Sequence, residues 1–236
     1  MKELDIVYIL RNDWKTDAAE LRLSLRSVAE NFPHQRVLFY GGRPQGFRPD
    51  GGLEFKQIYP TRWGRVRETI RTVCKDSDVS SEFWLFNDDF FILHEISEEF
   101  AYDRGQLRKH INQLYRRIGF NSDYAKMLIA TETTLKAAGL PTVDYTMHLP
   151  MLIDKQQALA VLDDFRGVDV GFRTLYGNAT GIESTTISDV KINGLAEVPA
   201  DDWAFCSTSD TSFTVGDVGR WLADKFTTPS RWEAVE

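Results

Sequence analysis

The residues best suited to chemistry are Asn87, Asp88 and Asp89, which separate two apolar segments at residues 83–86 and 90–93. Carboxylates between buried strands cost free energy unless they are hydrogen-bonded, paired with a cation or bound to a metal. Hard divalent cations prefer oxygen ligands and often bridge a carboxylate to a substrate phosphate. The alternative is an acidic turn, because Asn and Asp favour turns. The apolar segment on each side favours a metal site, with Asp89 as the first ligand and Asp88 as the second.

Two arginines could bind the phosphate of such a ligand. Arg62 and Arg65 follow Pro60 and begin a segment whose apolar spacing predicts a helix. Helix N-termini favour anions, and a guanidinium can grip a phosphate with two hydrogen bonds. The alternative is a solvated basic face. We prefer Arg65 as the phosphate contact.

A polar segment at the end of the first predicted strand is a second candidate for ligand binding. Arg11, Asn12 and Asp13 follow the apolar residues 6–10. Ligands of open parallel sheets bind outside the carboxyl ends of the strands, so we expect these three residues to contact a nucleotide. An ordinary loop with Asp13 as a capping residue is the alternative.

Two residues between 140 and 150 could complete a metal and acid–base site. Neutral imidazole binds metals, so His148 is a candidate third ligand; a surface or core histidine is an equally good interpretation. Asp144 is a candidate general base that would take the proton of an attacking hydroxyl. A capping role is the alternative for Asp144, and Glu183 and Asp210 are rival bases.

The elements that must position these residues follow an alternating order in the first ninety residues. Strand, helix, strand, loop, strand, helix and strand predict a largely parallel sheet with helices on both faces. The candidate residues after the first and fourth strands then meet at one edge of the sheet. The predicted strands are 6–10, 37–40, 55–59 and 83–86, and the predicted helices lie around 21–32 and 66–73.

The remainder of the chain is predicted to be helical and then rich in loops. Apolar spacing indicates helices at 107–118 and 124–135, a third from Asp154, and a last one near 216–226. The glycine-rich segment 176–181 is interpreted as a loop that either covers an acceptor or simply connects elements. Short strands are expected at 190–192 and 203–206. This region forms a mixed, loop-rich extension of one domain.

Composition limits the class of protein. The 236 residues carry a net charge of −7, which argues against a general nucleic-acid binder, because nonspecific affinity comes mainly from neutralised phosphates. No apolar run approaches the roughly 20 residues that cross a membrane. The charged N-terminus is unlike a signal peptide, and Cys74 and Cys206 are isolated, so we expect a cytoplasmic protein.

Four segments resemble known transferases. A strand that ends in an acidic cluster, after a helix with basic residues at its start, resembles the GT-A class of glycosyltransferases. The same chain resembles the Stealth family of sugar-phosphate transferases more narrowly, and its last third is loosely similar to transferase-like proteins of phage genomes. The segments similar to Stealth proteins are LDIVY at 4–8, ELRLSLRSV at 20–28, FNDDFF at 86–91 and MHLP at 147–150.

The resemblance implies a GT-A-like, Rossmann-like α/β fold and a metal-dependent glycosyltransferase. In that class Mn²⁺ or Mg²⁺ is held against the donor diphosphate, here by Asp88, Asp89 and His148, while Asn87 joins the donor contacts. We expect a nucleotide-sugar donor, with a UDP-sugar as first choice, and a hydroxyl acceptor on a saccharide or small molecule. A single domain spans residues 1–236, with 1–100 binding the nucleotide sugar and 101–236 the acceptor.

Several alternatives remain open at this point. A Stealth-type enzyme would transfer a sugar 1-phosphate, and a phage enzyme could glycosylate hydroxymethylated bases of DNA, with the basic stretch 104–117 tracking phosphates. A carbohydrate- or nucleotide-binding module would keep the pocket without turnover. A phosphatase with an aspartyl nucleophile is disfavoured, because Asn87 occupies the place of that nucleophile.

Overall fold

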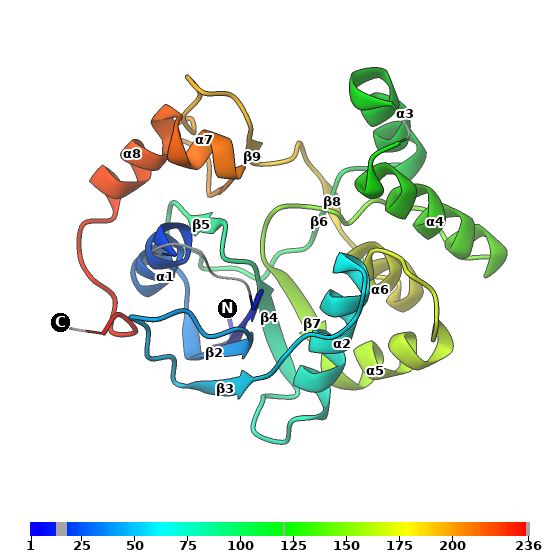
Figure 1. The fold of residues 1–236 in the computed structure, drawn as a ribbon, viewed down its shortest axis with the longest axis horizontal. Coiled ribbons are helices and arrows are strands. Elements are labelled where there is room, and N and C mark those ends of the chain that lie inside the picture. The colour runs from blue at the N-terminus through cyan, green and yellow to red at the C-terminus, as the bar shows by residue number, and fades with distance from the viewer. Residues whose placement is uncertain (13–17, 120, 235–236) are drawn as a thin grey trace.

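A five-stranded sheet forms the centre of the protein, and the computed structural model describes residues 1–12, 18–119 and 121–234. Its strand order is β3-β2-β1-β4-β7, with the first four strands parallel and β7 antiparallel to β4 (Figure 1). The prediction of a largely parallel sheet is therefore confirmed. The strands are β1 (Leu4–Leu10), β2 (His34–Gly41), β3 (Gly51–Glu54), β4 (Glu82–Phe86) and β7 (Met151–Asp154).

Helices cover both faces of this sheet. Alternate residues of β1 point to opposite faces, so Tyr8 packs with α1 (Ala19–Asn31) while Val7 packs with α2 (Arg62–Lys75). The second face is also covered by α5 (Lys155–Asp164) and α6 (Phe172–Thr180). The predicted α/β class with two helical layers is confirmed.

The predicted third strand is wrong in position. Residues 55–59 form no strand, and β3 lies in the preceding segment, which its glycines had marked as a loop. A Cβ atom at Gly52 would lie 2.0 Å from the carbonyl oxygen of Phe39, and the φ of Gly52 is +105°. Glycine is therefore required for close pairing with β2.

The glycine-rich segment 176–181 is helical and not a loop. It forms the end of α6, and Gly181 stops that helix in the left-handed conformation, with φ +68°. Gly177 lies against the ring of Tyr145, where an added Cβ would approach a ring carbon to 2.5 Å. Gly177 therefore allows a helix to pack closely against an aromatic ring. The sequence alone does not distinguish this role of glycine from a role in a turn.

The remaining elements lie around one end of the sheet. A three-stranded sheet contains β5 (Phe90–Ile92), β10 (Phe205–Thr208) and β9 (Lys191–Ile192), in the order β5-β10-β9. Figure 1 shows α3 and α4 beyond α6, away from the N-terminal strands. No helix in the described ranges is long and apolar enough to span a bilayer. The other elements are β6 (Tyr102–Asp103), α3 (Leu107–Ile118), α4 (Asp123–Ala137), β8 (Thr185–Thr186), α7 (Asp210–Thr214) and α8 (Asp217–Lys225).

Candidate functional site

The acidic strand end lies beside the end of β1, as the parallel topology predicts. Tyr8 of β1 pairs with Phe86 of β4, so Arg11 and Asp88 both follow the same edge of the sheet. Burial raises the pKa of Asp88 and the positive charge of Arg11 opposes this shift, so the two side chains lie within electrostatic reach of each other. The segment that follows β2 approaches the end of β1 so closely that it needs glycine, since a Cβ at Gly42 would lie 1.9 Å from the carbonyl oxygen of Arg11.

Helix α1 fixes the segment that follows the acidic residues. The hydroxyl of Ser24 donates to the carbonyl oxygen of Phe90 and also bonds the Tyr8 hydroxyl at 2.8 Å. The hydroxyl of Ser27 accepts from the backbone N–H of Ile92 at 3.0 Å. These buried hydrogen bonds hold β5 against α1, so they set the position of Asp89 immediately before β5.

Glu20 and the three aspartates whose charges act on it come from three parts of the chain, and we call them the acidic cluster: Glu20, Asp88, Asp89 and Asp210. Burial raises the pKa of Asp88 to about 6, and the charges of Asp89 and Asp210 add to the shift. Burial likewise raises the pKa of Glu20 to about 7, although Thr208 donates a hydrogen bond to Glu20 Oε1 at 2.8 Å. Asp88, Asp89 and Asp210 contribute further to the raised pKa of Glu20. The cluster therefore holds more negative charge than its surroundings neutralise.

Asp89 is contacted by two residues of the C-terminal sheet. Its Oδ2 accepts from Ser207 Oγ at 3.0 Å and lies 3.1 Å from the ammonium of Lys191. Ser207 pairs with Phe90 across β10 and β5, and with Lys191 across β10 and β9, so the register brings both groups to Asp89. Local sequence patterns could not identify either residue, because each is more than 100 positions from Asp89.

A second cation approaches from α6. The guanidinium of Arg173 donates to the carbonyl oxygens of Leu149 at 2.8 Å and Leu85 at 3.2 Å. It also lies 5.2 Å from the centre of the Phe90 ring. Burial lowers the pKa of Arg173 to about 10, against the opposing charge of Asp89. Arg173 thus stays cationic at neutral pH. Sequence analysis missed it because the region after the helix that begins at Asp154 was predicted to be rich in loops.

The predicted metal set of Asp88, Asp89 and His148 is not assembled. His148 Nδ1 lies 2.8 Å from Asp189 Oδ2, and Asp189 also pairs with Arg104 at 3.1 Å. Burial would raise the pKa of Asp189, but the interaction with His148 and the charge of Arg104 hold it at about 2. Within the ranges that the structure describes, no three His, Cys, Asp or Glu side chains gather as a metal-binding group.

Asp144 has the geometry of a structural carboxylate. It is fully buried; its Oδ2 lies 2.6 Å from His110 Nδ1, and its Oδ1 accepts from both the hydroxyl and the N–H of Thr146. Burial would raise the pKa of Asp144, but these hydrogen bonds keep it below its ordinary value. An acceptor hydroxyl cannot reach either oxygen in this conformation, which argues against the predicted base. The rivals differ: Asp210 belongs to the acidic cluster, and Glu183 lines a cavity.

The predicted donor contacts Arg62 and Arg65 lie in the first turn of α2. Thr61 caps this helix by accepting from the Gly64 N–H at 3.0 Å. Arg62 is exposed, with its guanidinium 5.3 Å from the Trp63 ring, whereas Arg65 is half-buried. The turn is therefore formed as predicted, and Arg65 is the less solvated of the two cations.

Asn12 has a structural use in addition to any ligand contact. Its amide donates to the carbonyl oxygen of Phe55 at 2.8 Å and accepts from the Gln57 N–H at 2.8 Å. Gln57 in turn donates to the Leu10 carbonyl oxygen and to the Thr69 hydroxyl, which ties the middle of α2 to the end of β1. Arg11 is exposed at this edge. Asp13, the third predicted residue, lies outside the described residues.

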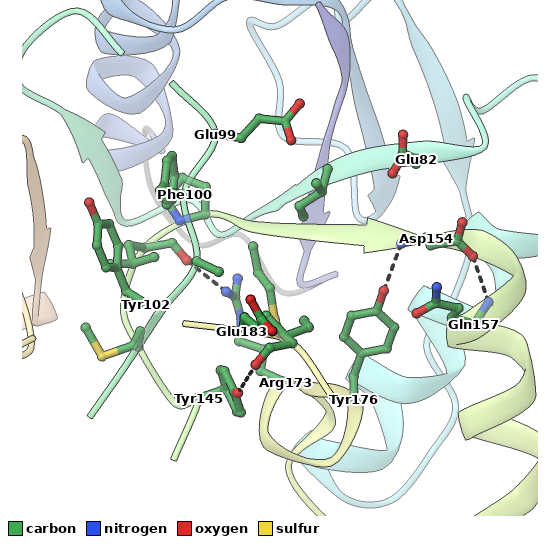
Figure 2. Close-up of a pocket in the computed structure, with 17 residues that line it drawn as sticks. Glu82, Glu99, Phe100, Tyr102, Tyr145, Asp154, Gln157, Arg173, Tyr176 and Glu183 are labelled. Atoms are coloured by element: carbon green, nitrogen blue, oxygen red, sulfur yellow. Dashed lines mark hydrogen bonds between the residues drawn. The ribbon is translucent and has the colours of Figure 1, made fainter. Parts of the chain in front are cut away.

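A cavity of about 370 Å³ lies along strand β7 and not over the acidic cluster (Figure 2). Figure 2 shows Arg173, Tyr145, Tyr176 and Glu183 on the side of the strand that faces α6. Its volume lies within the range of small-molecule sites, roughly 300–1,000 Å³. No predicted donor or metal residue lines it.

Comparisons with known proteins identify the fold. No protein-family model and no curated protein matches the sequence. The structure is similar to that of galactosyltransferase LgtC in complex with donor and acceptor sugar analogues, with a TM-score of 0.53 and 12% identity over 95% of this chain and 94% of that one. Glycosyltransferase GlyE of Streptococcus pneumoniae TIGR4 gives a TM-score of only 0.39 and 7% identity, over 80% of this chain and 46% of that one. The chain therefore has the GT-A-like α/β fold of LgtC.

Proposed function

We propose that the protein is a glycosyltransferase that moves a sugar from a nucleotide-sugar donor to a hydroxyl acceptor with the help of Mn²⁺ or Mg²⁺. The observation that carries this proposal is the acidic cluster at the carboxyl end of β4, where ligands of parallel sheets bind. Two of its members, Glu20 and Asp88, have raised pKa values, first because they are buried and then because the neighbouring carboxylates repel their charge. The fold shared with LgtC, whose structure contains donor and acceptor sugar analogues, supports the same reaction class.

The acidic cluster fits a cation that is bound together with the donor. Mg²⁺ is usually held by one or two carboxylates plus substrate phosphates and water, and not by a cage of protein ligands. Asp88 and Asp89 supply two such carboxylates, and the donor phosphates and water would complete the ligands of the cation. When bound, the cation would supply Lewis-acid stabilisation of the departing nucleoside diphosphate. His148 stays with Asp189 in this scheme.

The chain's own groups orient the site. Lys191 and Ser207 fix the Asp89 carboxylate, and Arg11 and Arg65 provide positive charge on the side expected to face the diphosphate. In transfer, the acceptor hydroxyl oxygen forms a bond to the anomeric carbon of the donor sugar. The bond from that carbon to the diphosphate oxygen breaks, its electron pair leaves with the diphosphate, and the hydroxyl proton passes to solvent.

The test is a thermal-shift titration with nucleoside diphosphates, nucleotide sugars and Mn²⁺, separately and in combination. A ligand at a hundred times its Kd contributes about 2.7 kcal/mol, equivalent to a rise in Tm of roughly 5–10 °C for a chain of this size. We expect such a rise for UDP or a UDP-sugar with Mn²⁺ and a much smaller one for Mn²⁺ alone, because the diphosphate completes the cation's ligands.

Asp89→Ala should abolish the combined effect, whereas the matched control Asp224→Ala, at an exposed position in α8, should preserve it. The proposal fails if no nucleotide stabilises the wild-type chain with any divalent cation. It also fails if Asp89→Ala responds like the control.

Product analysis separates the neighbouring functions. Release of UDP from a UDP-sugar indicates transfer of the sugar, whereas release of UMP indicates a sugar-1-phosphate transferase of Stealth type. Binding of the nucleotide sugar with no product of either kind would indicate a binding module. Among the acceptors, hydroxymethylated DNA is the one that the net charge of −7 disfavours most, because the negatively charged protein would repel a polyphosphate.

A further inference from the structure

The cavity beside β7 runs along the free edge of the central sheet. Residue Asp154 of β7 pairs with Glu82 and Met151 pairs with Leu85, so the cavity extends from the start of β4 toward its carboxyl end. Three steps of an extended strand span roughly 10 Å. This length and the volume of about 370 Å³ suit one or two sugar rings. Figure 2 shows Tyr145, Arg173, Tyr176 and Glu183 on one side of the strand and Glu99 on the other.

Aromatic rings form much of the wall. Tyr145 donates its hydroxyl to the carbonyl oxygen of Ile182 at 2.8 Å, and the Tyr176 hydroxyl accepts from the Asp154 N–H at 2.9 Å. Because both hydroxyls are used in this way, the rings are held rigidly and present apolar surface to the cavity. Phe100 and Tyr102 stack on each other, with ring centres 5.4 Å apart. Such surfaces suit the C–H faces of sugar rings.

The charge around the cavity is negative. Four carboxylates line it, those of Glu82, Glu99, Asp154 and Glu183, and Arg173 is the cation that lines it as well. The guanidinium of Arg173 is already engaged by two carbonyl oxygens and by the ring of Phe90. A phosphate or uronate would be repelled here, whereas the hydroxyl and amine groups of a sugar are donors that carboxylates accept. A nucleoside diphosphate is therefore a poor occupant.

Arg173 connects this cavity with the acidic cluster. It lines the cavity, bonds Leu85 near the end of β4, and is within electrostatic reach of Asp89. Leu149 and Met147 line the same end of the cavity. A ligand that fills the cavity to this end would approach the carboxyl edge of β4, where the donor is proposed to bind.

We propose that this cavity is the acceptor subsite and that it takes a saccharide without acidic groups, either neutral or amine-bearing. The assignment of the cavity as an acceptor subsite rests on the proposed glycosyltransferase function. The binding of the saccharide itself depends only on the rings and carboxylates of the cavity.

The first experiment measures saccharide binding to the full chain by calorimetry and saturation-transfer NMR, without donor. The probes are lactose, a disaccharide of glucosamine and digalacturonic acid, which are neutral, cationic and anionic. We expect the glucosamine disaccharide to bind most tightly, lactose next, and digalacturonic acid at least about tenfold more weakly than the glucosamine disaccharide, because like charges oppose its entry. Equal binding of all three probes would overturn the inference.

A matched pair of variants locates the binding. Glu99 lines the cavity, whereas its neighbour Glu98 does not, and both are exposed. Glu99→Arg should lower the affinity for the glucosamine disaccharide by about fivefold, which is the effect of reversing one solvent-screened charge. Glu98→Arg should leave this affinity unchanged. Equal effects of the two variants would place the saccharide elsewhere.

The same protein sample distinguishes the failure of this inference from the failure of the proposed function. Nucleotide binding without saccharide binding overturns the acceptor subsite and leaves the transferase proposal standing. Saccharide binding without any nucleotide binding overturns the transferase proposal and with it the acceptor role. Transfer of sugar to a bound probe, with KM for that probe raised in Glu99→Arg but not in Glu98→Arg, supports both.

Discussion

Two sets of largely desolvated carboxylates in this protein show opposite electrostatics. In the acidic cluster, burial and like charges raise the pKa of Asp88 to about 6 and that of Glu20 to about 7. Near the start of α3, hydrogen bonds from histidines keep the pKa of Asp144 low and that of Asp189 at about 2, despite burial. Where the chain supplies the counter-charge the carboxylate is structural, and where it does not a ligand has a role to fill.

The largest effect should come from removing a counter-charged carboxylate. Asp144→Ala leaves His110 and Thr146 without their partner in a buried site, and breaking such a pair costs about 3–5 kcal/mol. Chemical denaturation should show this loss in the free energy of unfolding. A loss below about 1 kcal/mol would contradict the structural role, and Asp224→Ala, which is exposed, serves as the control.

The sequence predicted the sheet and the acidic strand end because both depend on local patterns. Continuous apolar runs such as residues 83–86 identify buried parallel strands, and the order of elements then brings their carboxyl ends together. The sequence failed where glycine was ambiguous. Gly52 and Gly177 permit close packing in a strand and a helix, yet each had been interpreted as part of a loop.

The sequence could not separate Asp144 from Asp88, because the partners that distinguish them are distant. His110 is 34 residues from Asp144, and Lys191 is 102 residues from Asp89. Local context predicted Asp144 as a general base and His148 as a metal ligand, whereas in the fold Asp144 pairs with His110 and His148 pairs with Asp189. Pairing of this kind is decided by tertiary packing, which leaves no periodic signal in the chain.

The next largest effect tests the acidic cluster through catalysis. If Asp89 holds the donor with a cation, Asp89→Ala should lower the transfer rate by on the order of a hundredfold, since loss of Lewis-acid stabilisation costs several kcal/mol. The measurement is the steady-state release of nucleoside diphosphate at saturating Mn²⁺. His148→Ala should be much less affected, because His148 is paired with Asp189. Equal losses in both variants would return His148 to the metal site.

A smaller effect concerns the pH dependence of stability. The folded-state pKa of Glu20 is about 7 against an ordinary 4.5, so the folded protein binds more protons between these values. Its contribution to the free energy of unfolding therefore falls as the pH rises from about 4.5 to 7. Glu20→Gln should remove this fall, about 1–2 kcal/mol after allowance for solvent screening. Urea unfolding of both proteins at pH 5 and pH 7.5 measures the difference, and parallel pH profiles would contradict the raised pKa.

The smallest effect is also the one that distinguishes the two sets by sign. At pH 7.5, without ligand, Asp88→Asn should raise the free energy of unfolding by about 1 kcal/mol, because it removes a carboxylate that burial and Asp89 disfavour. The matched change Asp189→Asn should lower it, because it removes the partner of His148 and Arg104. Denaturation of the two variants beside the wild type decides the matter. If both changes destabilise the protein, Asp88 is a structural carboxylate like Asp189, and its raised pKa no longer supports a bound cation and diphosphate at this position.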